Sequence, residues 1–183
     1  MLPFLLLCFC ASIVYGQVPV LGKCPNVTVK MDFEPSKYFG FWYEIARFYT
    51  SFEANQKCHS ATYTSLPSGH FQVFNQALDM EDHEQNATGD AYIPDPKVKA
   101  KIKVKFNEAA PYADYWVVDT DYETYTLVFS CVDIVGVSHL EFAWILARKS
   151  SIDQSVRDKL YQTLESFGVK SQHFMDDDKT DCH

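Results

Sequence analysis

The sequence predicts an all-β domain of eight antiparallel strands, followed by one α-helix that packs against the outside of the sheet. Three observations support this prediction. From residue 39 to residue 149 the chain divides into short segments rich in aromatic and β-branched residues, which are typical of strands. Several segments alternate between polar and apolar residues, so each has one face toward solvent and one toward a core. After the last segment the apolar spacing changes to that of an amphipathic helix.

Residues 1–16 precede this domain and have the pattern of a secretory signal peptide. The run from Leu2 to Val14 is almost entirely apolar, yet it is shorter than the roughly 20 residues that a membrane-spanning helix needs. It ends in Val14-Tyr15-Gly16, which places small residues where a signal peptidase cleaves, before Gln17. We therefore expect a secreted, extracellular protein with a single domain over residues 17–183.

The expected strands are separated by turn-forming proline, glycine and aspartate residues. The clearest strand lies in residues 97–106, where lysines alternate with apolar residues. Eight strands at this spacing are typical of a sandwich or of an up-and-down barrel, and the alternation alone does not distinguish the two. The expected strands are residues 40–49, 57–65, 70–78, 87–93, 98–106, 114–119, 124–131 and 139–148.

The expected helix follows the last strand. Ser151 and Gln154 have the spacing of a capping box, which predicts that the helix begins there. Gly168 is a residue type at which helices commonly end. The acidic segment after Met175 is expected to be irregular as far as Cys182. The apolar stripe that would face the sheet consists of Ile152, Val156, Leu160 and Leu164.

Four cysteines remain after the predicted signal, which indicates two disulfides in a secreted chain, with three pairings open. Their long spacings lack the patterns of zinc sites, so we expect no bound metal. The sequons at Asn26 and Asn86 are candidate glycosylation sites. The net charge of −8 disfavours nucleic acid as a partner, because phosphate backbones repel an acidic protein.

Three short motifs resemble the signature regions of the lipocalin family. Gly40 and Trp42 form a Gly-x-Trp motif at the first strand, Thr120-Asp121-Tyr122 lies between the sixth and seventh strands, and Arg148 ends the eighth. The sequence around the first and last motifs is most similar to the apolipoprotein D-like branch, as a divergent or invertebrate member. The resemblance implies an eight-stranded barrel, the lipocalin calyx, with the helix outside. It also implies that Arg148 lies over the Trp42 indole and closes one end, which is a structural role.

The same resemblance implies two disulfides, Cys24–Cys131 and Cys58–Cys182. It further implies that the barrel interior binds a small hydrophobic molecule such as a fatty acid, sterol, retinoid or bilin. Trp144 matches a pocket position, and alternation along its strand then turns Phe142 and Leu146 inward and Ala143, Ile145 and Ala147 toward the helix. The residues expected to contact the ligand are Tyr63, Asn75, Tyr115 and Trp144 by resemblance, and Phe71, Phe129 and Phe142 by alternation.

We therefore expect a carrier with no cofactor and no catalytic residue. The sequence has no Gly-x-Ser-x-Gly and no His-Glu-x-x-His motif, and the expected disulfides leave no free thiol. Haem ligation by His59 or His70, which lie on expected strands, is a weaker alternative. The main alternative is a protein-binding lipocalin, a receptor ligand or inhibitor that acts through its loops. The apolar loop 132–140 is expected at the barrel mouth, where it would contact a lipoprotein or membrane surface or pack over the opening.

Overall fold

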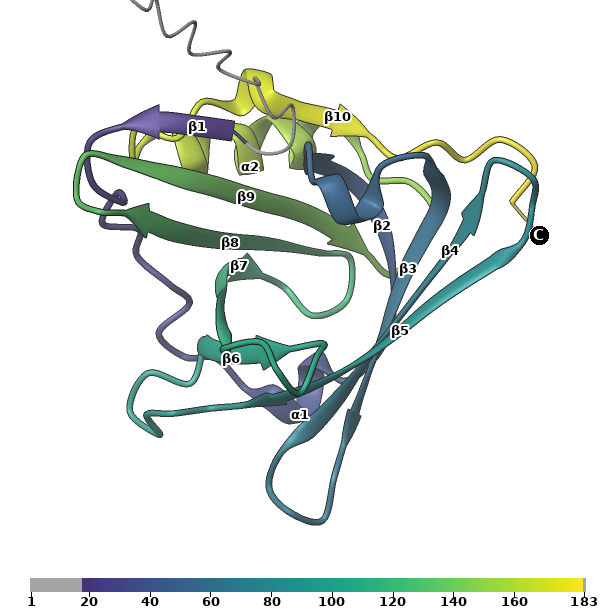
Figure 1. The fold of residues 1–183 in the computed structure, drawn as a ribbon, viewed down its shortest axis with the longest axis horizontal. Helices are drawn as coiled ribbons and strands as arrows, with labels where there is room; N and C mark the ends of the chain where they lie inside the picture. The colour runs from purple at the N-terminus through teal and green to yellow at the C-terminus, as the bar shows by residue number, and fades with distance from the viewer. Residues whose placement is uncertain (1–17, 183) are drawn as a thin grey trace, which may run out of the picture.

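A computed structural model describes residues 18–182, so the predicted signal peptide lies outside the described residues. Its centre is an antiparallel β-barrel with a helix on the outside (Figure 1). The barrel strands are β2 (Gly40–Phe48), β3 (Gln56–Ser65), β4 (Phe71–Asp79), β5 (Glu84–Tyr92), β6 (Lys101–Lys105), β7 (Ala113–Thr120), β8 (Tyr125–Ile134) and β9 (Ser138–Ala147). The other elements are β1 (Val18–Leu21), α1 (Pro35–Tyr38), η1 (Ser51–Glu53), α2 (Gln154–Glu165), η2 (Ser171–His173) and β10 (Phe174–Asp176).

Each barrel strand pairs antiparallel with the next along the chain, as short connections allow. The sheet closes because β9 also pairs with β2, with Tyr43 opposite Ala147 and Arg47 opposite Trp144. The expected fold class is therefore confirmed, and closure selects the up-and-down barrel over the sandwich.

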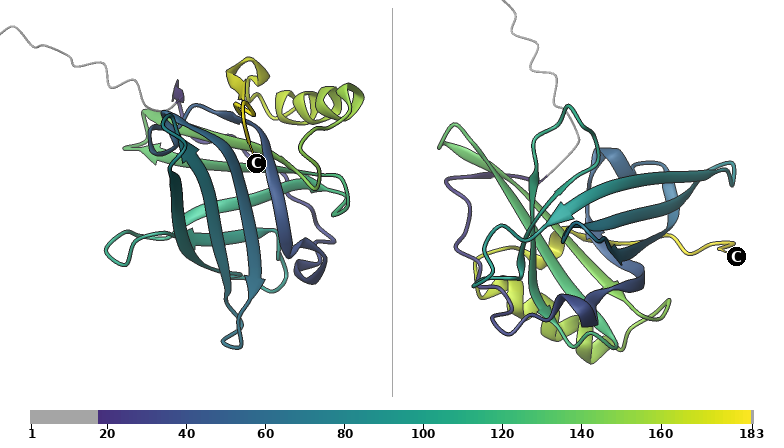
Figure 2. Two further views of the ribbon diagram at one scale, coloured as in Figure 1. Left: turned by 90° about the vertical axis from the view of Figure 1, so that its right-hand side faces the viewer. Right: turned by 90° about the horizontal axis from the view of Figure 1, so that it is seen from below.

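The two faces of the barrel wall form two separate cores. The inner core contains Trp42, Tyr63, Phe71 and Val73, with Trp144 packed against it. The outer core lies between β8, β9 and α2 (Figure 2), and Leu160 and Leu164 of the helix are fully buried in it. Its other members include Ala143, Ile145 and Ala147, which confirms the expected division of residues along β9.

The structure differs from the expectations at β6 and at the start of α2. Strand β6 is confined to Lys101–Lys105, because residues 95–100 form turns in which the Asp95 carboxylate accepts the amide of Lys97 at 2.8 Å. The predicted capping box is wrong. Helix α2 begins only at Gln154, with Asp153 as the residue before it, and Ser151 and Ile152 lie outside the helix. Ile152 nonetheless packs against the outer core.

The C-terminal segment supplies a strand where irregular structure was expected. Strand β2 pairs with β3 only from Gly40 to Tyr43, and beyond a bulge its edge pairs instead with β10. The amide of Asp177 then donates to the carbonyl of Ile45 at 3.0 Å, and the amide of Cys58 on β3 donates to the carbonyl of Asp178 at 2.9 Å. The segment therefore fills a gap in the wall between β2 and β3.

The three signature motifs meet at one end of the barrel. The Arg148 guanidinium lies 3.6 Å from the centre of the Trp42 ring and donates to the carbonyl oxygens of residues 37, 38, 39, 41 and 122. Gly40 has a φ of 101°, and a β-carbon there would lie 3.4 Å from Arg148 Nη1, so glycine suits both its backbone and its neighbour. The Asp121 carboxylate accepts the amides of Glu123, Thr124 and Tyr125 and holds the adjoining turn. These contacts seal this end.

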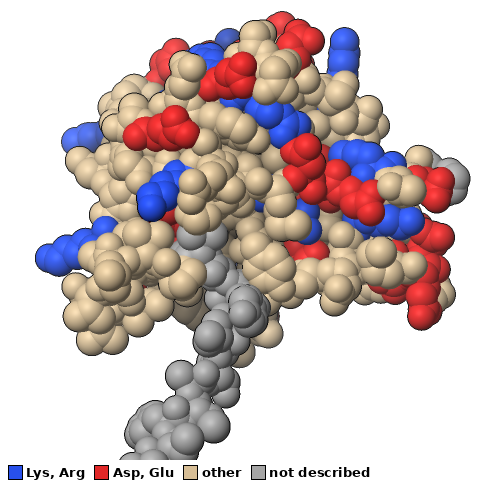
Figure 3. Space-filling model, turned by 90° about the horizontal axis from the view of Figure 1, so that it is seen from above, with Lys and Arg blue, Asp and Glu red and all other residues tan. Residues whose placement is uncertain are grey.

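The surface carries charges of both signs. On the face drawn in Figure 3, acidic and basic side chains are interspersed, and acidic groups gather toward the side on which the C-terminus lies in Figure 1. There, Lys57 pairs with Asp82 at 2.7 Å. No helix within residues 18–182 is long and apolar enough to cross a membrane.

Candidate functional site

The candidate site is the interior of the barrel away from the Trp42–Arg148 seal. Trp144 and Phe142 are neighbours on the inner face of β9, with stacked rings whose centres are 6.2 Å apart. Tyr115 packs against the inner core from β7, and Asn75 lies opposite the inward-facing Ala61. All four side chains remain partly exposed, although they face inward. Solvent therefore reaches this part of the interior, whereas Tyr63 and Phe71 nearer the sealed end are buried.

Three tyrosine hydroxyls meet at the floor of this interior. Tyr115 Oη lies 2.8 Å from Tyr38 Oη and 2.7 Å from Tyr63 Oη, so the three form a short chain of hydrogen bonds. Burial raises the pKa of Tyr38 to about 12, and it also raises the pKa of Tyr63 and Tyr115 well above the usual range, with a further contribution from the neighbouring tyrosines. The hydroxyls are therefore neutral at physiological pH and act as donors and acceptors.

One predicted contact residue lies elsewhere. Phe129 pairs with Ala143 across the β8–β9 ladder, and paired residues share a face of the sheet. Ala143 faces α2, so Phe129 lies fully buried in the outer core and the prediction that it lines the pocket is wrong. The inward positions of β8 are instead Thr126, Val128 and Ser130, opposite Leu146, Trp144 and Phe142.

An ionic cluster that no sequence pattern predicted lies in the wall beside Trp144. Arg47 pairs with Trp144 and Glu44 with Leu146 across β2 and β9, so both charged residues face inward. Arg47 Nη1 lies 2.8 Å from Glu44 Oε1 and 3.5 Å from Asp177 Oδ1. Burial, and then the neighbouring Glu53, raise the pKa of Glu44 well above its usual range. Alternation along the strand from Trp42 predicts that Glu44 faces inward. It predicts the wrong face for Arg47, because the register shifts between Glu44 and Ala46.

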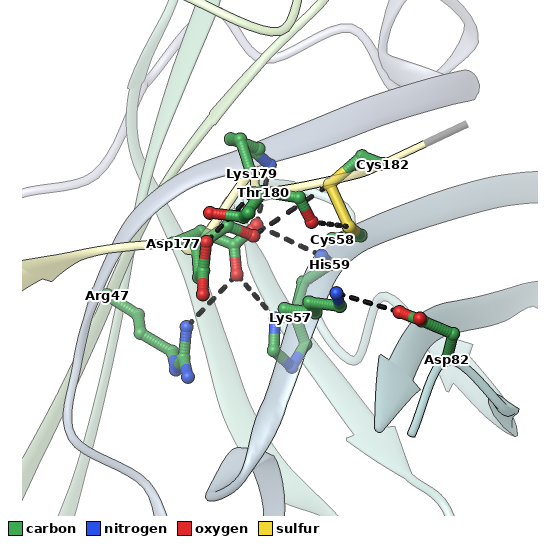
Figure 4. Close-up of a disulfide and its surroundings, with 10 residues drawn as sticks. Arg47, Lys57, Cys58, His59, Asp82, Asp177, Lys179, Thr180 and Cys182 are labelled. Carbon is green, nitrogen blue, oxygen red and sulfur yellow. Dashed lines mark hydrogen bonds and ion pairs between the residues drawn. A yellow bond between two sulfur atoms is a disulfide. The ribbon is translucent and has the colours of Figure 1, made fainter. Parts of the chain in front are cut away.

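Asp177 connects this cluster to the C-terminal segment (Figure 4). Its fully buried carboxylate lies 2.6 Å from His59 Nδ1 and accepts the backbone amide of His59 at 3.0 Å and Lys179 Nζ at 2.6 Å. Because a carboxylate only accepts, His59 Nδ1 donates to Asp177, and His59 Nε2 has no hydrogen-bond partner within the described residues. The Cys58–Cys182 disulfide holds the same segment next to His59.

The other disulfide joins Cys24 to Cys131, so the structure contains both bridges that the resemblance implied. Of the two histidines weighed as haem ligands, His70 lies on the outside, 2.9 Å from Asp90, and His59 is paired with Asp177. Glu44, His59 and Asp177 place their ligand atoms within 4.8 Å of one another, a spacing that a metal ion could use. The Arg47 guanidinium already contacts both carboxylates and supplies the positive charge there.

The β8–β9 hairpin projects apolar side chains from the end opposite the seal. Strand β8 continues to Ile134, so the expected loop is a tight turn at residues 135–137 with a φ of 73° at Gly136. Val135 is 92% exposed and Val137 69% exposed, and Leu21 of β1, which pairs with Ser138, is 90% exposed. The two sequon asparagines, Asn26 and Asn86, are exposed.

Comparisons with known proteins agree with this geometry. Residues 33–178 match the family model described as a lipocalin-like domain. The chain is 38% identical to apolipoprotein D of Macaca fascicularis over 167 residues, which cover 91% of this chain and 88% of that protein. It is 29% identical to the Lazarillo protein of Schistocerca americana, over 78% of this chain and 68% of that protein. Insecticyanin from the tobacco hornworm Manduca sexta has a similar structure, with a TM-score of 0.78 and 26% identity over 91% of each chain.

Proposed function

This chain belongs to the lipocalin family, in its apolipoprotein D-like branch, and we propose that it is a secreted carrier that binds one small hydrophobic molecule inside its barrel. The observation that carries the proposal is the partial exposure of Trp144, Phe142, Tyr115 and Asn75 on the inner face of a barrel sealed at one end. Aromatic walls of this kind supply contact area, and a few polar groups orient the ligand.

The polar groups favour a ligand with an apolar body and one polar end. The Tyr115 hydroxyl lies between those of Tyr38 and Tyr63, and the Asn75 amide has no hydrogen-bond partner within the described residues. Fatty acids, sterols, retinoids and bilins have this character. Burying about 400 Å² of such a ligand contributes on the order of 10 kcal/mol before the costs of association.

We propose that the protein does no chemistry on its ligand. A nucleophilic thiolate would be needed for isomerisation of the kind that some barrels perform, and the four cysteines of the described part of the chain form two disulfides. Secretion rests on the pattern of residues 1–16 and on these disulfides, which form in oxidising compartments. Glycosylation is proposed at Asn26 and Asn86, which are exposed.

We also propose that the β8–β9 hairpin contacts a lipoprotein or membrane surface during loading. Val135, Val137 and the adjoining Leu21 present a small apolar surface. Flotation with phosphatidylcholine vesicles tests this contact, and Val135→Ser with Val137→Ser should abolish it. Binding to a protein receptor instead, with no flotation of the parent protein, would favour the protein-binding alternative.

A fluorescence titration tests the carrier proposal. The delipidated protein is titrated with a fatty acid, a sterol, a retinoid and a bilin, with Trp144→Phe as the reporter variant and Phe129→Leu as the matched control. We expect saturable quenching at one ligand per chain, blunted in Trp144→Phe and retained in Phe129→Leu, because Trp144 faces the interior whereas Phe129 lies in the outer core. A folded protein that gives no saturable response with any of the four would contradict the proposal.

A further inference from the structure

Three N–H or O–H groups inside the barrel mouth, on Thr50, Arg47 and Trp144, lie close to the side-chain carboxylate of Glu53. Glu53 lies at the end of η1, the short turn between β2 and β3. Its carboxylate accepts the Thr50 hydroxyl, lies 3.3 Å from Arg47 Nε, and accepts Trp144 Nε1 at 3.3 and 3.4 Å. Arg47 and Trp144 face inward as a pair of the β2–β9 ladder, so the donors point at the space that a ligand would enter.

Glu53 fills this place imperfectly. The Trp144 contacts are longer than the 2.9–3.0 Å of an ordinary N–H···O hydrogen bond. Arg47 Nε is fully buried, yet its N–H has no hydrogen-bond partner within the described residues, because Glu53 lies near it without the required alignment. Glu53 is tethered by its own backbone, whose carbonyl accepts Arg47 Nη2 at 3.2 Å. A carboxylate free of that tether could align with both N–H groups.

The charges around Arg47 determine what can bind there. Glu44 and Asp177 already contact Arg47 Nη1, so an additional buried anion would add uncompensated negative charge. A ligand carboxylate that replaces Glu53 leaves the number of carboxylates unchanged. Glu53 itself is 12% exposed and belongs to a surface turn in which Phe52 is 61% exposed, so it has a short path into water.

We propose that Arg47, Trp144 and Thr50 form a carboxylate-binding site, which Glu53 occupies as a stand-in until the carboxylate of an amphipathic ligand displaces it. This inference rests on the proposed carrier function and narrows its ligand class to long-chain carboxylates over neutral lipids. Glu53 is then a specificity-determining residue, because it competes with carboxylates and leaves neutral ligands unaffected.

The test compares cis-parinaric acid with its methyl ester at pH 8, where the acid is ionised. The wild-type protein should bind the acid more tightly than the ester. Glu53→Ala removes the competitor, so the affinity for the acid should rise about tenfold while that for the ester stays within about twofold, as expected for one charge-assisted hydrogen bond. Glu81→Ala is the matched control, because Glu81 is an exposed carboxylate on another connection and should change neither affinity.

Two further variants keep the test decisive. Glu53→Gln retains the size of the side chain and remains informative if the alanine variant folds poorly. It should raise the ratio of the affinity for parinaric acid to the affinity for its methyl ester. Trp144→Phe removes one donor and should lower that ratio. An unchanged affinity ratio in the folded Glu53 variants would overturn the proposal. Tight binding of dodecylamine to the wild type that disappears in the Glu53 variants would also overturn it, because Glu53 would then be a binding site for cations. If neither parinaric probe binds the wild type, the carrier function fails as well.

Discussion

Replacing Asp177 with Asn should weaken the barrel wall where the C-terminal segment fills it. The two carboxylate oxygens of Asp177 receive four donors: His59 Nδ1, the His59 amide, Lys179 Nζ and Arg47 Nη1. An amide of the same shape has one accepting oxygen, so in either orientation at least one donor faces an NH₂ group. A buried donor without a partner costs about 1–3 kcal/mol, and the lost negative charge also leaves the Arg47 guanidinium less compensated. We expect a loss of about 3 kcal/mol in the free energy of unfolding.

The same substitution should change how stability depends on pH. Burial alone would raise the pKa of Asp177, but hydrogen bonds from His59 and Lys179 outweigh burial and hold that pKa below its usual value of 3.8. A group whose pKa is lowered in the folded state stabilises the protein above its unfolded pKa, and this contribution disappears as the pH falls through the folded pKa. The difference in the free energy of unfolding between wild type and Asp177→Asn should therefore become smaller as the pH falls from about 5 to about 2.

Urea unfolding followed by circular dichroism measures both effects, with the disulfides kept intact. Asp178→Asn is the matched control, because this neighbouring side chain is exposed and should cost less than about 1 kcal/mol. The reasoning would be refuted by an Asp177→Asn penalty below about 1 kcal/mol at pH 7, or by a penalty that does not change on acidification.

Three other predictions follow from the described contacts. Arg148→Met should lower the free energy of unfolding, measured in urea, by about 3 kcal/mol, because it removes hydrogen bonds to carbonyls and the contact with Trp42. Arg148→Lys should lower it less. Equal stability of Arg148→Met and wild type would contradict the sealing role. The double variant Cys58→Ser, Cys182→Ser opens a loop of 124 residues and should lower the free energy of unfolding by about 5 kcal/mol in the chain-entropy model. A loss well below that of Asp177→Asn would count against this prediction. Tyr38, whose pKa is raised to about 12, stabilises the folded state fully below the unfolded pKa, and this stability is lost as the pH rises through the folded pKa. The difference in absorbance at 295 nm between wild type and Tyr38→Phe should show the ionisation of Tyr38 together with alkaline unfolding, and a difference that titrates reversibly near pH 10 in the folded protein would be the contrary result.

The alternation of side chains was sufficient to predict the strands and part of the interior. Trp144 and Tyr115 were placed inside by resemblance to the lipocalin family, and Phe71 was placed inside by alternation. The same rule was wrong for Phe129, because nothing in its own strand shows which of two apolar faces turns inward. The face is set by pairing with Ala143, and a small residue such as alanine leaves room for the helix.

The ionic cluster could not be predicted because it depends on contacts distant in sequence. Asp177 reaches His59 across 118 residues and Arg47 across 130, and both contacts depend on the C-terminal segment entering the gap between β2 and β3. That gap opens after Tyr43, where β2 stops pairing with β3, and no residue type marks this point. Glu53 in turn reaches Trp144 only because η1 folds over the mouth.

The position of β10 has a consequence for biosynthesis. The segment that completes the wall between β2 and β3 is made after every other strand, so the nascent barrel stays open along this seam until residues 174–182 have emerged. During that time Cys58 has no native partner, whereas Cys24 can pair as soon as Cys131 appears. Among the four cysteines of the described residues, Cys24 and Cys58 are the pair nearest in sequence, and a bridge between them would have to be reshuffled before the native bridges form. The Cys58–Cys182 bridge therefore cannot form until the segment that carries Cys182 has been synthesised.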